Sequence, residues 1–162
     1  MKHILYIIIL CFAYTTTIWA ENYIIINQVM YDSPLNERVT IRPYSHGEFI
    51  ELYNAGTSSV ALTGWTLTGS GSTEKGEFPS NLSMPAGSYL IIAYRYSTTP
   101  EFQLNDLFTL PTGHSNYAIY YQSKLVLSNS GETLTLKNAS NIIVDRLVYD
   151  GTSNKSNPNR LH

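Results

Sequence analysis

The sequence contains a single cysteine, Cys11, which lies in the apolar N-terminal segment. The remainder of the chain therefore excludes disulfide bonds, thiol catalysis and cysteine-based zinc sites. Charged residues make up only 14% of the chain and the formal net charge is −2, so the composition carries no strong nucleic-acid signal. Instead the chain has 13 tyrosines and many Ser, Thr and Asn residues, which is typical of β-strands and polar turns.

The N-terminal segment has the layout of a secretory signal peptide. A weakly positive start precedes the apolar residues 4–13, and Ala20 is the small residue that cleavage requires. The apolar run is shorter than the roughly 20 residues of a membrane-spanning helix, and an uncleaved anchor is the alternative. The bulky residues before Cys11 do not fit a lipid-anchor signal. We therefore expect a signal peptide over 1–20, a secreted, periplasmic or cell-surface location, and no stable membrane anchor after cleavage.

Beyond this segment, apolar and polar side chains alternate with a period of about two residues, which is typical of β-strands. The length fits one domain, which we place at 21–150, followed by a polar tail at 151–162. Several short strands separated by turn residues predict an all-β sandwich or barrel. The expected strands are residues 23–30, 48–53, 60–67, 88–95, 117–127, 132–137 and 141–149. The strand at 88–95 is almost entirely apolar, so we expect it to be central and covered on both faces.

Three local features add detail. The apolar residues at 62–67 fall out of phase, which predicts a β-bulge at Thr63-Gly64 that places Trp65 in the core. Residues 125–136 are predicted to form a hairpin with a loop at 128–131. The segment 97–116 is longer than an ordinary connection and contains five large apolar residues. We expect it to pack as a short helix or irregular flap over an end or edge of the sandwich.

Several motifs stand in the order found in bacterial lamin tail domains. They are residues 24–32 (IIINQVMYD), 48–54 (EFIELYN), 62–67 (LTGWTL), 84–93 (MPAGSYLIIA), 127–134 (LSNSGETL), and Val144-Asp145 followed by Tyr149. The match extends over nearly all of the chain beyond the signal segment, so the chain resembles this family.

The resemblance implies an immunoglobulin-like antiparallel β-sandwich that is not itself catalytic. Bacterial members of the family are typically exported and often appended to secreted nucleases or phosphatases, and in nuclear lamins the same fold is an interaction module. One position departs from the family pattern, because Gln28 stands where the first strand commonly carries an acidic residue. A cation-binding role of that acid therefore does not carry over to this chain.

Catalytic patterns are absent from the sequence. The histidines beyond the signal segment lie in turn-like or terminal sequence and lack the spacing of metal ligands. Glu48 and Glu51 are three residues apart in one strand, so they face opposite sides and cannot share a substrate atom. We expect Glu48 to cap the start of the strand, and Glu51 to face solvent or to pair with a base on a neighbouring strand. The chain is therefore predicted not to be an enzyme.

Calcium is the one cofactor that we consider. Asp32, Glu48 and Asp150 would meet if the ends of the first, second and last strands lie together, and calcium takes oxygen ligands from such loops. The alternative is ordinary turn chemistry, since Asp and Asn start turns by bonding to their own backbone.

A possible binding surface is formed by tyrosines that flank the long segment. They are Tyr94, Tyr96, Tyr117, Tyr120 and Tyr121. Exposed tyrosines bury a large area at interfaces, yet tyrosine is also a common strand residue that needs no binding role.

We therefore expect a non-catalytic interaction or structural module with an unidentified protein or glycan partner at the cell envelope. The alternatives are a carbohydrate-binding module that uses the tyrosines, and an accessory-domain remnant of a larger secreted nuclease or phosphatase.

Overall fold

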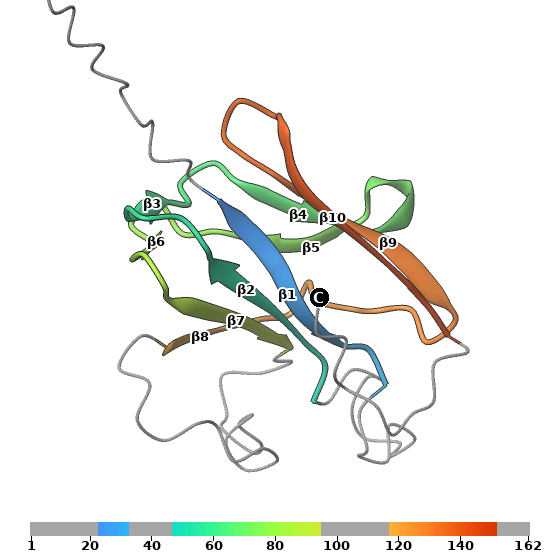
Figure 1. Ribbon diagram of the computed structural model, residues 1–162. Helices are drawn as coiled ribbons and strands as arrows, with labels where there is room; N and C mark the ends of the chain where they lie inside the picture. The colour runs from blue at the N-terminus through green and yellow to red at the C-terminus, as the bar shows by residue number, and fades with distance from the viewer. Residues whose placement is uncertain (1–22, 33–46, 95–116, 152–162) are drawn as a thin grey trace, which may run out of the picture.

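A computed structural model describes residues 23–32, 47–94 and 117–151 of the chain. These residues form two four-stranded sheets that stack face to face, with a short two-stranded sheet at one end (Figure 1). The elements are β1 (Ile24–Met30), β2 (Phe49–Asn54), β3 (Val60–Ala61), β4 (Thr66–Thr68), the 3₁₀ turn η1 (Ser70–Ser72), β5 (Glu74–Glu77), β6 (Ser83–Met84), β7 (Tyr89–Tyr94), β8 (Tyr117–Gln122), β9 (Gly131–Lys137) and β10 (Ile143–Asp150).

The strand order defines two layers. Sheet 1 has the order β1-β2-β7-β8 and sheet 2 has the order β10-β9-β4-β5, while β3 pairs with β6. The pairs run antiparallel except for β7 and β8, which run parallel. The predicted all-β, immunoglobulin-like sandwich is confirmed, with one parallel pair that the sequence did not indicate.

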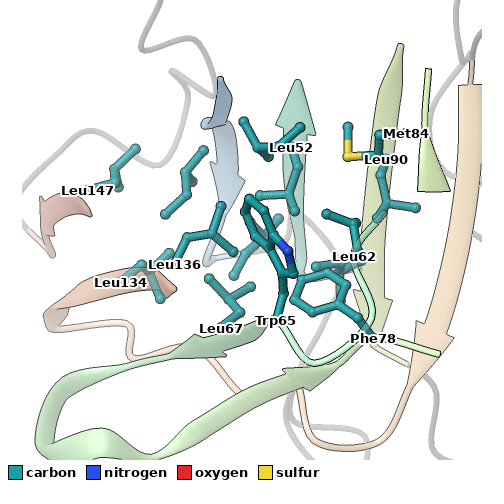
Figure 2. Close-up of a cluster of buried hydrophobic side chains, with 14 of the residues drawn as sticks. Leu52, Leu62, Trp65, Leu67, Phe78, Met84, Leu90, Leu134, Leu136 and Leu147 are labelled. Carbon is teal, nitrogen blue, oxygen red and sulfur yellow. The ribbon is translucent and has the colours of Figure 1, made fainter. Parts of the chain in front are cut away.

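The main hydrophobic core lies between the two sheets. Trp65 is buried there among Leu52 and Leu90 of sheet 1 and Leu67 and Leu134 of sheet 2 (Figure 2). An indole ring buries more apolar surface than any other side chain in this cluster, so it contributes strongly to the hydrophobic stabilisation. The prediction that Trp65 anchors the core is confirmed.

Alternating burial explains why these stretches form strands. In β9, Leu134 and Leu136 are buried, whereas Thr133, Thr135 and Lys137 are only partly buried. This is the two-residue period that the sequence predicts, because successive side chains of a strand point to opposite faces.

β7 is central in sheet 1 and is covered on both faces, as its apolar sequence predicts. Leu90 and Ile92 join the main core, while Ile91 and Ala93 point away from sheet 2 into a separate cluster. We call this the outer cluster: Met30, Phe49, Ile91 and Ala93, with Ile119 and Tyr121 packed against it.

The expected single strand at 60–67 is wrong, and so is the bulge within it. The chain forms a turn at this point, in which the Trp65 N–H donates a hydrogen bond to the Leu62 carbonyl at 3.0 Å. Gly64 has a φ of +75°, which favours glycine. The turn forms because β3 pairs with β6 whereas β4 pairs within sheet 2, so the chain must change sheets between them.

The predicted hairpin over 125–136 is also wrong. β9 begins at Gly131, but its two neighbours are β10 and β4, so neither edge is left for the preceding residues. Leu125 and Leu127 are nevertheless buried in the main core, in a segment outside any strand. Burial does alternate over Leu125, Val126 and Leu127, as in a strand, but such alternation does not identify a pairing partner.

Several predictions fall on residues outside the described ranges. They concern the signal peptide at 1–20, the segment 97–116 and, apart from Gly151, the tail at 151–162. In the described part of the chain, no helix is long and apolar enough to cross a membrane.

Candidate functional site

The three carboxylates of the calcium hypothesis lie at or next to strand ends. Asp32 follows β1, Glu48 precedes β2, and Asp150 ends β10. The buried Glu48 Oε2 accepts a hydrogen bond from the Leu127 N–H at 2.8 Å. Within residues 23–32, 47–94 and 117–151, no group of three or more His, Cys, Asp or Glu side chains is placed to hold a metal ion. Calcium binding stays a prediction from the sequence, and the contact found for Glu48 is structural.

Glu51 is buried on the outer face of sheet 1, so the expectation that it faces solvent is wrong, and its pairing with a base stays a prediction. A register shift between Ile26 and Gln28 brings Asn27 beside it, and the Asn27 Nδ2 donates to the Glu51 Oε1 at 2.6 Å. The Glu48 carboxylate accepts its hydrogen bond from Leu127, on the face of sheet 1 that carries the main core. The two carboxylates therefore face opposite sides of the strand, as predicted, and do not form an acid–base pair.

A buried polar network surrounds Glu132, at the end of sheet 2 where β9 begins. The Lys75 Nζ lies 3.1 Å from the Glu132 Oε2, and the two side chains are only 7% and 5% exposed. The Tyr149 hydroxyl donates to the Glu132 Oε1 at 2.9 Å, and the Ser128 N–H donates to the same oxygen at 3.0 Å. The Lys75 ammonium also donates to the Val126 carbonyl. Both charges of this pair are thus compensated by further hydrogen bonds, which burial of an ion pair requires.

Burial raises the pKa of Tyr149 far above its ordinary value of 10, and the neighbouring Glu132 carboxylate raises it further. A phenol whose pKa is raised stays protonated at physiological pH. The Tyr149 hydroxyl therefore keeps the proton that it donates to Glu132 near neutral pH.

The network orders the segment that crosses from β8 in sheet 1 to β9 in sheet 2. The Lys75 ammonium donates a hydrogen bond to the carbonyl of Val126. The carboxylates of Glu48 and Glu132 accept hydrogen bonds from the N–H groups of Leu127 and Ser128, respectively. Three consecutive backbone groups of a segment without strand pairing are therefore satisfied by charged side chains. The arrangement explains how Leu125 and Leu127 remain in the core although their segment belongs to no strand.

The candidate tyrosines do not share one surface. Tyr94 and Tyr120 pack against the main core, whereas Tyr121 packs against the outer cluster on the opposite face of sheet 1. Tyr96 lies outside the described residues, and Tyr117 is the first residue of β8.

A different tyrosine pair was missed by the sequence reasoning. Tyr53 of β2 and Tyr89 of β7 are directly opposite each other on the outer face of sheet 1, with stacked rings whose centroids are 4.6 Å apart. Partial burial, with smaller contributions from Tyr53 and Glu51, raises the pKa of Tyr89. Both tyrosines occupy the outward phase of their strands, but only the register places them side by side.

Side chains close both seams between the sheets. At one seam, the Asp145 Oδ2 of β10 accepts a hydrogen bond from the Ile26 N–H of β1 at 2.6 Å. At the other, the Gln122 Oε1 of β8 accepts one from the Glu77 N–H of β5 at 3.1 Å. In both cases a side chain from one sheet satisfies a backbone donor on the edge strand of the other, which protects that edge from pairing with another chain.

Large apolar side chains are exposed along β10 and the turn before it. Ile142, Ile143 and Val148 are 61%, 48% and 58% exposed, and Arg146 lies exposed between them. We call these four residues the β10 surface. Ile143 pairs with Lys137 and Val148 with Thr133, so the surface continues onto the polar outer face of sheet 2. It combines apolar contact area with an arginine, and arginine is enriched at protein interfaces.

The sequence carried a signal for part of the buried network but not for the β10 surface. Glu132 is in phase with Leu134 and Leu136, and Tyr149 is in phase with Leu147, so the strand period itself placed both on the core side. Lys75 has no such apolar neighbours in its strand. The exposure of apolar residues on β10 depends on which strand lies at the edge of sheet 2, and only the topology decides that.

The family comparison agrees with this architecture. Residues 19–151 match the model of the lamin tail domain, a range that includes all of the described residues. No curated protein sequence matches the chain significantly. Most of the chain is covered by the family match, and the structure over that range is the two-layer sandwich expected of a non-enzymatic, immunoglobulin-like module. The chain belongs to the lamin tail domain family.

Proposed function

We propose that the chain is a non-catalytic protein-interaction module that works outside the cytoplasm. The β10 surface is the observation that carries this proposal. It groups three exposed aliphatic side chains around Arg146 at the edge of sheet 2. Apolar side chains clustered beside an arginine favour a protein partner, because interface cores are rich in apolar contacts and arginine anchors.

The buried charged groups support the same proposal. Glu48, Lys75 and Glu132 each bind a backbone group of the 126–128 segment, so their charges serve the fold. A partner would therefore meet the exposed residues of β10. Its recognition element would combine an apolar contact with a carboxylate for Arg146, since a charge-assisted pair fixes orientation.

Cross-linking of the exported chain in envelope extract tests the proposal. The double variant Ile143→Asn/Val148→Asn should lose the cross-linked partner that the wild type captures. Val126→Asn is the matched control, because Val126 is 52% exposed and its carbonyl binds Lys75 of β5, the strand at the opposite edge of sheet 2. Equal capture by the wild type and by the double variant, with both proteins folded, would contradict the proposal. Absence of any partner above background would also count against it.

Export is supported by the signal-peptide layout of residues 1–20. Mass spectrometry of the chain recovered from medium or periplasm should give a mature N-terminus at Glu21. Recovery of the whole chain in the cytoplasmic fraction, with Met1 retained, would overturn the proposed location.

Carbohydrate binding is the second candidate, and the stacked pair of Tyr53 and Tyr89 is the observation that favours it. Partly exposed aromatic rings beside the buried Glu51 combine an apolar platform with a polar group. A glycan array should then show binding that Tyr53→Ala/Tyr89→Ala removes, and an array without any signal retires the idea. The remaining alternative, an accessory domain cut from a larger secreted nuclease or phosphatase, predicts an adjacent catalytic reading frame in the genome.

A further inference from the structure

The buried pair of Lys75 and Glu132 has more hydrogen-bond donors than acceptors. A lysine ammonium carries three N–H groups. Among the described residues it meets two acceptors, the Glu132 Oε2 at 3.1 Å and the Val126 carbonyl. The two side chains are only 7% and 5% exposed, so the pair is almost entirely shielded from water. An unmatched donor and two buried charges are both costly at such a site.

The two oxygens of the Glu132 carboxylate have different surroundings. Oε1 accepts hydrogen bonds from the Tyr149 hydroxyl at 2.9 Å and from the Ser128 N–H at 3.0 Å. Oε2 faces Lys75 and accepts a longer hydrogen bond from the Ser70 N–H at 3.3 Å. Two donors on one oxygen are the arrangement that stabilises the negative charge that develops on a carbonyl oxygen during acyl transfer. The amine lies beside the other oxygen, from which a nucleophile would displace it.

Gly69 lets the backbone pack directly against this pair. It follows β4, the strand that lies between β5 with Lys75 and β9 with Glu132. A Cβ at this position would overlap both the Glu132 Oε2 and the Lys75 Cε. The site therefore holds an amine and a carboxyl group in contact. Well-oriented groups in one molecule react as if at an effective concentration of about 10⁵–10⁸ M.

We propose that the Lys75 amine and the Glu132 carboxyl group condense to an amide that covalently links β5 to β9. One proton passes from Nζ to Oε2 within the pair. The Nζ lone pair then forms a bond to the Glu132 Cδ, while Tyr149 and Ser128 stabilise the charge that develops on Oε1. Oε2 takes a second proton from Nζ and leaves as water. One ammonium and one carboxylate thus give one amide and one water, and the ion pair is the state before the bond forms.

The polar groups around the pair suit the amide. Its single N–H keeps the Val126 carbonyl as acceptor, and its oxygen keeps the donors Tyr149 and Ser128. The Ser70 N–H loses its acceptor, but Ser70 is exposed and water can replace it. Condensation removes both buried charges and the unmatched ammonium N–H, so the product needs no compensation for buried charge.

The cross-link would act as a disulfide does in other exported domains. Beyond Cys11 the chain has no cysteine. The amide closes a loop of chain that contains β6, β7 and β8, and it fixes the crossing segment at Val126. A covalent bond that closes such a loop stabilises the fold chiefly by restricting the unfolded chain.

Peptide mapping of the purified, unfolded chain tests for the bond. Trypsin should not cut after Lys75, and residues 125–137, which contain Glu132, should remain joined to the peptide of Lys75 with the loss of one water. Trypsin should cut after Lys124, whose pair with Glu77 is exposed and serves as the control within the same chain. Complete cleavage after Lys75, with a free 125–137 peptide, would overturn the proposal.

Two variants separate this bond from other losses of water. Lys75→Arg keeps the positive charge, but a guanidinium stays protonated and is not a nucleophile. Relative to the mass of its own sequence, the wild type should therefore lose one water more than Lys75→Arg, and the control Lys124→Arg should match the wild type. Equal losses in wild type and Lys75→Arg would place the missing water elsewhere, such as at Asp150-Gly151, and contradict the proposal. Should Lys75→Arg fail to fold, the peptide map of the wild type decides.

The role of Tyr149 is tested by the rate at which the bond forms. Tyr149→Phe removes one of the two donors to the Glu132 Oε1 and keeps the ring. During cell-free synthesis, the cross-linked chain should accumulate about a hundredfold more slowly in this variant than in the wild type. Equal rates in the two chains would show that the hydroxyl takes no part in the condensation.

Discussion

The carboxylate of Asp145 in the last strand binds the backbone N–H of Ile26 in the first strand, with a distance of 2.6 Å between Oδ2 and N. This contact joins residues that are far apart in the sequence and links the edge of sheet 2 to the edge of sheet 1 (Figure 1). It also occupies a backbone donor that would otherwise invite pairing with another chain. The first and last strands of the domain are thus joined by a side chain where no ladder of backbone hydrogen bonds connects the two sheets.

Asp145→Ala should lower the free energy of unfolding by about 1–3 kcal/mol, because it leaves the partly buried Ile26 N–H without its acceptor. Asp145→Asn keeps an acceptor oxygen and should lose less. Urea unfolding measures both effects, and sedimentation should show more self-association for the alanine variant. Arg146→Ala serves as the control at the adjacent exposed position. A loss for Asp145→Ala no larger than that of the control would show that the contact does not stabilise the seam.

Lys75→Met should be far more destabilising than Lys124→Met. Lys75 is buried against Glu132, and its removal leaves a buried carboxylate without its charge partner, at a cost of about 3–5 kcal/mol. Lys124 pairs with Glu74 and Glu77 at an exposed position, where solvent screens the charges and the pair adds little to stability. Chemical unfolding of the two variants provides the comparison. Similar losses at the two positions would mean that the Glu132 network does not hold the crossing segment.

Trp65→Ala should cost about 3–5 kcal/mol, because the indole fills the space between the two sheets and the cavity left behind cannot collapse fully. Thermal or urea unfolding followed by circular dichroism measures the loss. The other tryptophan, Trp19, lies in the predicted signal peptide, so in a chain that begins at Glu21 the fluorescence of Trp65 reports on the core. A variant within about 0.5 kcal/mol of the wild type would contradict the core position.

The exposed ion pair between Glu77 and Lys124 should be visible in a pH titration. The hydrogen bond to Lys124 and its positive charge lower the pKa of Glu77 from 4.5. A lowered carboxyl pKa contributes stability that is present above the ordinary pKa and is lost as the pH falls through the lowered value. NMR of the Glu77 carboxyl carbon should give a midpoint below 4.5 that rises in Lys124→Met. Arg146→Gln, on the opposite edge strand of sheet 2, should leave the midpoint where it is.

The strand period predicted the inside and outside of most strands correctly. It placed Leu134 and Leu136 in the core, and it predicted that the strand containing Ile91 is covered on both faces. Trp65 is in the core as predicted, but a turn at residues 62–65 places it there and not the predicted bulge. The strand period did not predict which strand a given segment pairs with. Residues 125–127 have the alternation of a strand, but β4 occupies the edge of β9 that a hairpin would need. Pairing partners are distant in sequence, so local alternation does not identify them.

The candidate site shows the same division. The sequence identified Glu48 as a strand-end residue, yet its contact with Leu127 depends on how the crossing segment lies against β2. The tyrosines around the long segment were read as one surface, but the register distributes Tyr120 and Tyr121 to opposite faces of sheet 1. β2 and β7 pair antiparallel in a register that sets Leu52 opposite Leu90, and the same register sets Tyr53 opposite Tyr89.

The amino-acid sequence by itself determined the class of fold, the family and the side of each strand that is buried, because a two-residue period and turn residues are local properties of the chain. Only the tertiary structure decided that β7 and β8 run parallel, that Asp145 meets Ile26, and that Lys75 reaches Glu132. These relationships arise from strand order and sheet stacking, which bring together residues that no local pattern connects.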